Sequence, residues 1–277
     1  MINILTIDVE DYFHVLGLSS VIRKEEWDSY PQRVMENTLR LLHILKSYNI
    51  KATFFVLGWV AERYPELVEE ILRHGHEVAS HGYSHDPIYR QTGEEFHVEL
   101  KRSKEILEGI SGEKVIGYRA SNFSITEQTL WALDILVEEG FEYDSSIYPI
   151  KYDRYGLPNA RRFPHVICRG SRYKIWEFPP STFRILGRNL PIAGGGYFRL
   201  YPYWVTARFI KQVNRRGYPA LVYIHPWELD PDQPRFKPEL KNRFRHYVNL
   251  DKAEGNLRRL LREFRFTSIS SLLKSTI

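Results

Sequence analysis

Acidic and imidazole side chains gather at three points of the sequence, each directly after a short apolar run. These groups are Asp8, Glu10 and Asp11; His81 and His85; and His225. Two imidazoles four residues apart lie on one face of a turn or helix start, so both can reach one metal ion. An isolated pair of this kind is also common on protein surfaces. Two histidines joined by one carboxylate leave coordination positions open for water and substrate, which is typical of a catalytic zinc site.

The acidic cluster also needs a compensating charge. Three carboxylates within four residues repel one another unless a cation or an arginine neutralises them, and one of them is expected to cap the helix that follows. Arg119, at the end of another apolar run, is a natural partner. The sequence therefore predicts that Arg119 pairs with an acid of this cluster.

His225 follows Val222, Tyr223 and Ile224. A histidine in apolar company is usually a core residue. Because the other motifs indicate a metal site, we interpret His225 as a general acid, with Asp144 holding its imidazolium.

The elements that must position these residues alternate between strands and helices. Strands are predicted over 2–7, 52–57, 76–80, 115–119, 141–145, 220–224 and 266–269. Helices are predicted over 34–48, 65–74, 94–110, 127–139, 203–216 and 253–263. This order indicates βαβ units and a parallel sheet, in an α/β fold that closes or nearly closes into a barrel. Chemistry in such barrels lies at the carboxyl ends of the strands, where the motifs fall.

A length of 277 residues suits one α/β barrel, so we expect a single domain over 1–277. Residues 148–203 break the alternation and are predicted to be an insertion that covers the barrel mouth. Within it, Gly194–Gly196 lacks the strand and helix of a phosphate-binding loop and is interpreted as a flexible loop near a ligand. Residues 226–277 are expected to be a basic C-terminal extension of the same domain.

The net charge of +5 comes from the end of the chain, since residues 235–277 hold 11 Lys and Arg against 4 Asp and Glu. Such a run is usually a solvated helix face. Peripheral contact with a membrane surface or an anionic polymer is the alternative. With the rest of the chain near neutral, no nucleic-acid partner is expected.

One cysteine, Cys168, excludes an internal disulfide and favours a reducing compartment. The first residues show no basic and apolar signal pattern, and no apolar run approaches the roughly 20 residues that span a bilayer. We expect a cytoplasmic protein with no transmembrane segment.

Five motifs in order resemble the polysaccharide deacetylases, the carbohydrate esterases that share the NodB homology domain. The motifs are Thr6–Asp11, His81–His85, Gly117–Phe123, Asp144–Ser146 and Tyr223–His225. The longer strings Asp8–Val15, Gly194–Pro202 and His225–Arg235 are similar to the subfamily associated with exopolysaccharide and exosortase gene clusters. The resemblance implies a distorted (β/α)7 barrel, a divalent metal that is usually Zn²⁺, and removal of N-acetyl groups from polymers of N-acetylglucosamine-type sugars in exopolysaccharide biosynthesis.

The resemblance also implies a role for each motif residue. Asp8 would be the general base, Arg119 would position Asp8, and His225, supported by Asp144, would protonate the leaving amine. His81 and His85 would be metal ligands. The third ligand would be Glu10 or Asp11, and Glu10 is preferred because alternation along an extended segment points it to the same side as Asp8.

Two further features bear on the walls of the site. The family usually has a proline where Ser121 stands, which predicts a looser wall of the site. Aromatic residues reach 14% and are frequent over 148–203, so we expect sugar stacking, with Tyr197, Trp227 and Phe123 as substrate contacts.

Two classes of alternative stay open. One is a related amidohydrolase acting on a cyclic amide, on peptidoglycan or on a lipid-linked sugar. The other is a non-catalytic sugar-binding barrel. The oligomeric state is not determined by the sequence.

Overall fold

Strand β1 (Ile2–Val9) lies at the centre of the fold in the computed structural model, which describes residues 1–152, 155–169, 173–192 and 194–276. It pairs in parallel with β10, β2 and β11. Every residue of β1 after Ile2 is buried. Such continuous burial is typical of a parallel strand that is covered on both faces, so the run Ile2–Val9 becomes the strand on which the others assemble.

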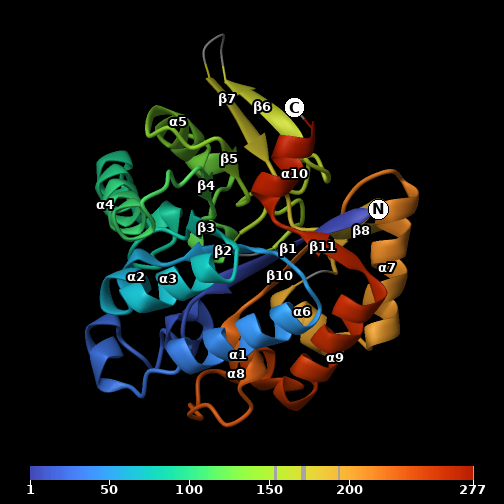
Figure 1. The fold of residues 1–277 in the computed structure, drawn as a ribbon, viewed down its shortest axis with the longest axis horizontal. Coiled ribbons are helices and arrows are strands. Elements are labelled where there is room, and N and C mark those ends of the chain that lie inside the picture. Colours follow the sequence, from blue (N-terminus) through green and yellow to red (C-terminus); the bar gives the residue numbers. More distant parts are fainter. Residues whose placement is uncertain (153–154, 170–172, 193, 277) are drawn as a thin grey trace.

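The main sheet has the order β10-β1-β2-β3-β4-β5-β7-β6, with β11 beside the start of β1. Its strands are β1, β2 (Thr53–Val56), β3 (Glu77–Ser80), β4 (Gly117–Tyr118), β5 (Tyr143–Asp144), β6 (His165–Arg169), β7 (Tyr173–Glu177), β10 (Leu221–Ile224) and β11 (Arg265–Thr267). In the described residues, the seven strands from β10 to β7 are mutually parallel and β6 is antiparallel to β7. The sheet curls as Figure 1 shows, and this confirms the predicted distorted (β/α)7 barrel.

The two ends of the parallel sheet, β7 and β10, are connected by individual hydrogen bonds rather than by strand pairing. No ladder connects β7 to β10 in the part of the chain that the structure describes. Instead, the Ser181 N–H donates to the carbonyl of Leu221 at 3.2 Å, and the Leu221 N–H donates to Ser181 Oγ at 2.8 Å. This irregular junction is what makes the barrel distorted.

Helices surround the curled sheet (Figure 1). They are α1 (Val34–Ser47), α2 (Gly58–Arg63), α3 (Pro65–Arg73), α4 (Gly93–Ser111), α5 (Ala132–Glu138), α6 (Gly195–Leu200), α7 (Tyr203–Arg215), α8 (Leu240–Tyr247), α9 (Leu250–Glu263) and α10 (Ile269–Thr276). Ile269 and Leu273 of α10 join Ile4 and Phe55 in one buried cluster. No helix among the described residues is long and apolar enough to cross a bilayer.

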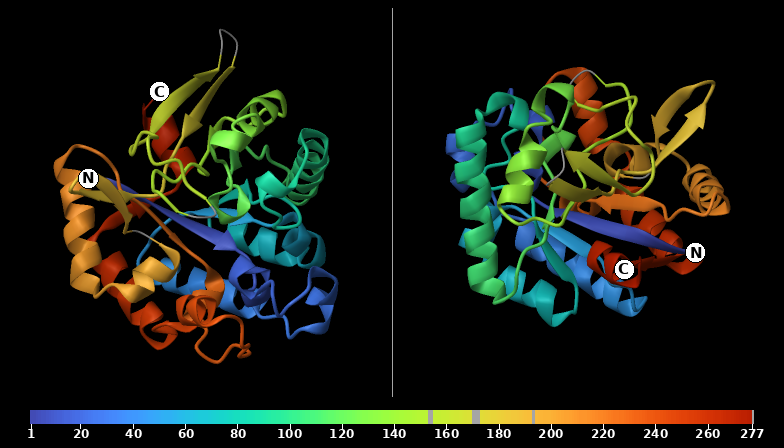
Figure 2. Two further views of the ribbon diagram at one scale, coloured as in Figure 1. Left: turned by 180° about the vertical axis from the view of Figure 1, so that it is seen from behind. Right: turned by 90° about the horizontal axis from the view of Figure 1, so that it is seen from above.

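The segment predicted as an insertion, 148–203, has two parts. Its strands β6 and β7 extend the main sheet, while β8 (Thr182–Ile185) and β9 (Arg188–Pro191) form a separate hairpin. Both hairpins project from the barrel in Figure 2. The sequence did not indicate these strands, because short hairpins lack the alternation of strands and helices from which the other strands were predicted. In the basic stretch 226–277, α9 buries Leu257 and Leu260, so that helix packs on the core with one face.

The short strand β4 depends on a glycine. A Cβ on Gly117 would lie 1.9 Å from Cζ of Tyr143, whose hydroxyl donates to Glu77 Oε1 at 2.8 Å. We predict that Gly117→Ala lowers the free energy of unfolding by about 1–3 kcal/mol through overpacking. Urea unfolding measures this loss. Gly109→Ala is the matched control, since no atom lies within 4 Å of its added Cβ, and equal stability of the two variants would contradict the prediction.

Candidate active site

A buried ion pair lies at the carboxyl ends of β1 and β4. Arg119 is fully buried, and its Nη1 donates to Asp8 Oδ1 at 2.6 Å and to Thr6 Oγ1 at 2.8 Å. Its Nε and Nη2 donate to the carbonyl and hydroxyl of Ser145 at 3.1 and 2.7 Å. The guanidinium also lies over the Phe55 ring, 4.2 Å from the centroid. The acid that pairs with Arg119 is therefore Asp8, and the hydrogen bond gives its side chain one defined orientation.

Glu10, His81 and His85 form a group of buried donors, among the described residues, whose ligand atoms lie within 4.8 Å of one another. Glu10 Oε2 lies 2.6 Å from His85 Nε2 yet has no hydrogen-bond partner of good geometry. A buried carboxylate oxygen left in this way fits a cation that both residues face.

The tautomer of His81 fits the same role. Its Nδ1 lies 2.8 Å from the carbonyl oxygen of Arg119 and donates to it, so that Nε2 carries the free lone pair. Burial lowers the pKa of His81 to about 4, which keeps the imidazole neutral near pH 7. A neutral imidazole oriented by a backbone carbonyl is the form in which histidine binds zinc.

Asp11 lies outside this group and organises backbone instead. Its carboxylate accepts the N–H groups of Tyr12 and Val34 at 2.8 Å each, and that of Arg33 at 2.6 Å. Burial raises the pKa of Asp11 to about 6 despite these hydrogen bonds. Asp11 thus connects the turn after β1 to the start of α1, and it is the acid of the cluster that caps a helix.

His225 lies on the opposite side of Glu10 from His85 and approaches both functional carboxylates. Its Nε2 is 3.3 Å from Glu10 Oε1 and 3.9 Å from Asp8 Oδ2. Burial lowers the pKa of His225, but the charges of Glu10 and Glu228 outweigh this effect and raise the pKa to about 9. His225 is thus an imidazolium at neutral pH, as a general acid must be.

The carboxylate that holds His225 differs from the predicted one. Glu228 Oε2 lies 3.0 Å from His225 Nδ1, whereas Asp144 accepts hydrogen bonds from the backbone and hydroxyl of Ser146. Glu228 follows His225 by three residues in a 3-10 turn, Pro226–Leu229, so its side chain folds back onto the imidazole. The i,i+3 spacing of a capping box in the sequence was the signal that could have revealed it.

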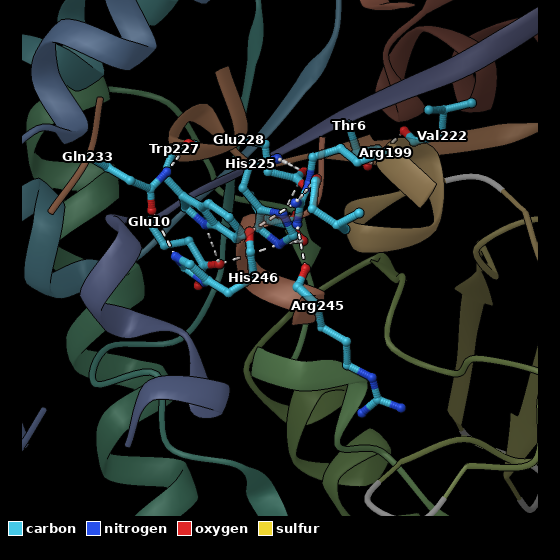
Figure 3. A network of polar contacts seen from close by, with 12 residues as sticks. Thr6, Glu10, Arg199, Val222, His225, Trp227, Glu228, Gln233, Arg245 and His246 are labelled. Carbon is cyan, nitrogen blue, oxygen red and sulfur yellow. Dashed lines mark hydrogen bonds and ion pairs between the residues drawn. The ribbon is translucent and has the colours of Figure 1, made fainter. Parts of the chain in front are cut away.

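Arg199 was not predicted and completes this network (Figure 3). Its Nε donates to Glu228 Oε1 at 2.7 Å, and both side chains are buried. The remaining guanidinium nitrogens donate to the carbonyls of Arg245, His246 and Val248 at 2.8–3.1 Å, at the end of α8. Arg199 and His225 together hold the pKa of Glu228 at about 2, against the opposing effect of its burial.

A pocket of about 400 Å³ opens above these residues. Its lining includes the predicted contacts Phe123, Tyr197 and Trp227. Trp227 is buried, donates its Nε1–H to Glu10 Oε1 at 3.3 Å and stacks on His246, so it contacts the candidate metal site as well as the pocket. Ser121 Oγ donates to the carbonyl of Asp86 at 2.9 Å, which ties the arginine loop to the segment after His85 rather than loosening it.

Two regions of the chain match models of known protein families. Residues 26–137 match the family model described as polysaccharide deacetylase. Residues 26–137 thus form a region of the polysaccharide deacetylase type. Residues 145–274 match a domain of unknown function, DUF3473. His81, His85 and Arg119 lie in the first region, and Arg199, His225 and Glu228 lie in the second.

Among curated proteins, the chain is 35% identical over 101 residues to a peptidoglycan-N-acetylglucosamine deacetylase of Bacillus cereus, which is 36% of this chain and 37% of that protein. The matched part of the chain thus spans little more than a third of the relative's length.

Two solved structures share the fold over 98% of this chain and 88% of their own chains. One, from Mycobacterium smegmatis, is assigned to the polysaccharide deacetylases, with a TM-score of 0.62 and 22% identity. The other is PuuE allantoinase, with a TM-score of 0.64 and 14% identity.

The geometry distinguishes the two acids that the sequence offered as third ligand. We predict that Glu10→Gln weakens Zn²⁺ binding by more than about 100-fold, because loss of an outer-shell partner alone costs roughly 10–100-fold. Asp11→Ala is expected to leave Zn²⁺ affinity within a few-fold and to lower the free energy of unfolding by about 2 kcal/mol, since three backbone N–H groups lose their acceptor. Competition with a chromophoric chelator and urea unfolding measure both quantities, and the reverse pattern would assign the ligand to Asp11.

Proposed function

We propose that the protein is a metal-dependent hydrolase that removes N-acetyl groups from N-acetylglucosamine-type units of a polysaccharide. The observation that carries this proposal is the meeting of three components in one pocket. They are the donor set Glu10, His81 and His85, the Asp8–Arg119 pair, and the His225 imidazolium. A base, an acid and a cation site facing one cavity are the parts that amide hydrolysis requires.

The donor set fits Zn²⁺, because two neutral imidazoles and one carboxylate are a common protein ligand set of catalytic zinc. A divalent cation held there would supply Lewis acidity to the acetamide carbonyl. Arg119 fixes the position of the Asp8 carboxylate, so that Asp8 can take a proton from the water that attacks the carbonyl carbon. The carbon–nitrogen bond then breaks as His225 gives its Nε2 proton to the leaving nitrogen, which releases acetate and a free amine.

The finer parts of the proposal rest on the sequence. An exopolysaccharide as substrate is supported by the similarity of the strings Asp8–Val15, Gly194–Pro202 and His225–Arg235 to the exopolysaccharide-associated subfamily. The single cysteine, Cys168, favours action in a reducing compartment.

Acetate release tests the reaction. We predict that the zinc-loaded protein releases acetate from N-acetylglucosamine oligomers and that Asp8→Asn lowers the rate by about 10²–10⁴-fold, as expected for loss of a general base. Asp251→Asn, an exposed carboxylate on α9, is the control and should leave the rate unchanged. A coupled acetate assay and mass spectrometry of the product give the result.

The same assay separates the alternatives. Ring opening of allantoin without acetate release from any amino-sugar polymer would replace the proposal with a cyclic amidohydrolase. Release from peptidoglycan fragments alone would change the substrate. Zinc binding with no turnover of any of these substrates would identify a non-catalytic sugar-binding barrel.

Glu228 supplies a second test, aimed at the orientation of the acid. We predict that Glu228→Gln lowers kcat by about 10–100-fold, in the range of other outer-shell partners, and leaves KM and Zn²⁺ affinity nearly unchanged. The neutral amide still reaches His225 Nδ1 but no longer stabilises the imidazolium. Steady-state kinetics on N-acetylglucosamine oligomers measure this split between kcat and KM.

Because the substitution also leaves Arg199 without its charged partner, thermal unfolding is measured in parallel. Glu228→Asp, which retains the charge, is expected to recover part of kcat. Asp144→Asn serves as the comparison, and a greater loss of kcat from it than from a folded Glu228→Gln would restore Asp144 as the supporting carboxylate.

A further inference from the structure

A second hollow, larger than the active-site pocket, lies beside the hairpin of β8 and β9. Its volume is about 1190 Å³, and the Lys and Arg side chains of its lining have no acidic counterpart among the described residues. We call it the arginine groove, and its cations are Lys151, Arg161, Arg162, Arg184, Arg188 and Arg216. No aspartate or glutamate lines it in the part of the chain that the structure describes. The whole chain carries 34 acidic residues against 39 basic ones, so a wall this one-sided is a local feature.

The groove cations lack acidic partners among the described residues. Arg161, Arg184, Arg188 and Arg216 are exposed and form no ion pair with any described residue. Arg162 is half-buried and donates to the hydroxyl and carbonyl of Thr182 rather than to an acid. Burial, and then the proximity of Arg216 and Arg184, lower its pKa. Like charges brought together without a counter-ion form a site that favours anions.

One short segment lines both the groove and the active-site pocket. Pro149, Ile150 and Lys151 border the groove, whereas Tyr152 and Tyr155 border the pocket. Asn189 Nδ2, from β9, donates to the carbonyl of Pro149 at 2.7 Å and fastens the hairpin to this segment. The groove thus begins only a few residues along the chain from the pocket. An extended ligand that leaves the pocket past Tyr152 would therefore reach the groove.

The pocket carries unpaired cations at its own mouth as well. Lys241 and Arg245 of α8 are exposed and line the pocket, and the Arg245 guanidinium lies over Tyr152, 5.1 Å from the ring centroid. Among the described residues that line the pocket, the acids are Asp8 and Glu10, and both belong to the proposed catalytic centre. Among the described residues, cations thus line both the pocket mouth and the groove, on either side of Tyr152.

We propose that the arginine groove is a subsite for the acidic units of a polysaccharide whose N-acetylated unit occupies the active-site pocket. This inference rests on the proposed function and narrows its substrate to a polymer that alternates N-acetylated amino sugars with uronic acids. Guanidinium groups match the two oxygens of a carboxylate in a bidentate manner. A parallel ring pair in the groove, Phe163 and Tyr218 with centroids 3.9 Å apart, adds a flat apolar face of the kind on which sugar rings stack.

Binding to fluorescently labelled hyaluronan oligosaccharides, which alternate glucuronate and N-acetylglucosamine, tests the subsite by anisotropy. We predict that the triple variant Arg184→Gln, Arg188→Gln, Arg216→Gln raises the Kd for these oligosaccharides by about 10-fold or more, since charge-assisted contacts are lost. Its Kd for neutral N-acetylglucosamine oligomers should stay the same. The control removes three exposed cations elsewhere, in Lys46→Gln, Arg73→Gln, Lys114→Gln, and should change the hyaluronan Kd by less than a few-fold.

Each other outcome overturns the subsite. Equal weakening by the two triple variants would mean that net charge alone attracts the ligand. Absence of hyaluronan binding by the unmodified protein would remove the site. Tighter binding of duplex DNA, lost in the same groove variant, would assign the groove to nucleic acid. Acetate release from neutral oligomers by the groove variant separates failure of the subsite from failure of the proposed function. If only the subsite proposal is wrong, the variant still releases acetate from these oligomers.

Discussion

The proposed catalytic centre depends on the ion pair and hydrogen bonds of the buried Arg119 guanidinium. A charge removed from water is tolerated only when opposite charge and hydrogen-bond acceptors surround it. Thr6 and Asp8 of β1 and Ser145, directly after β5, supply these partners. The carbonyl of the same residue receives the Nδ1–H of His81. One arginine therefore orients the proposed base with its side chain and a proposed metal ligand with its backbone.

The strand β1 explains how such a polar centre lies inside a barrel. Ile4 faces the apolar interior that α10 closes, whereas Thr6 and Asp8, two and four residues further along, face Arg119. The inward side of one strand thus changes from apolar to ionic along its length. Burial at one end stabilises the fold, and the same burial strengthens the electrostatic interactions at the other end because water is excluded.

Much of this arrangement could be predicted from the sequence, because strand ends and alternation are local properties. Asp8 and Glu10 lie on one side of an extended segment, and this placed Glu10 rather than Asp11 beside His85. The strand-end rule also gave Asp144 as the partner of His225, and there it was wrong. The rule shows that residues reach the same rim of the barrel, but it does not show which of them touch.

The network around His225 lay beyond such reasoning because its contacts are distant in sequence. Arg199 reaches Glu228 across 29 positions and the carbonyl of Val248 across 49, and neither spacing corresponds to a helical or strand period. Arg199 binds the end of α8 and the carboxylate that holds His225 at once, so the position of the proposed acid depends on how α8 packs. Residues 145–274, which match a domain of unknown function, therefore supply β7 and β10 to the barrel sheet and Arg199, His225 and Glu228 to the candidate active site.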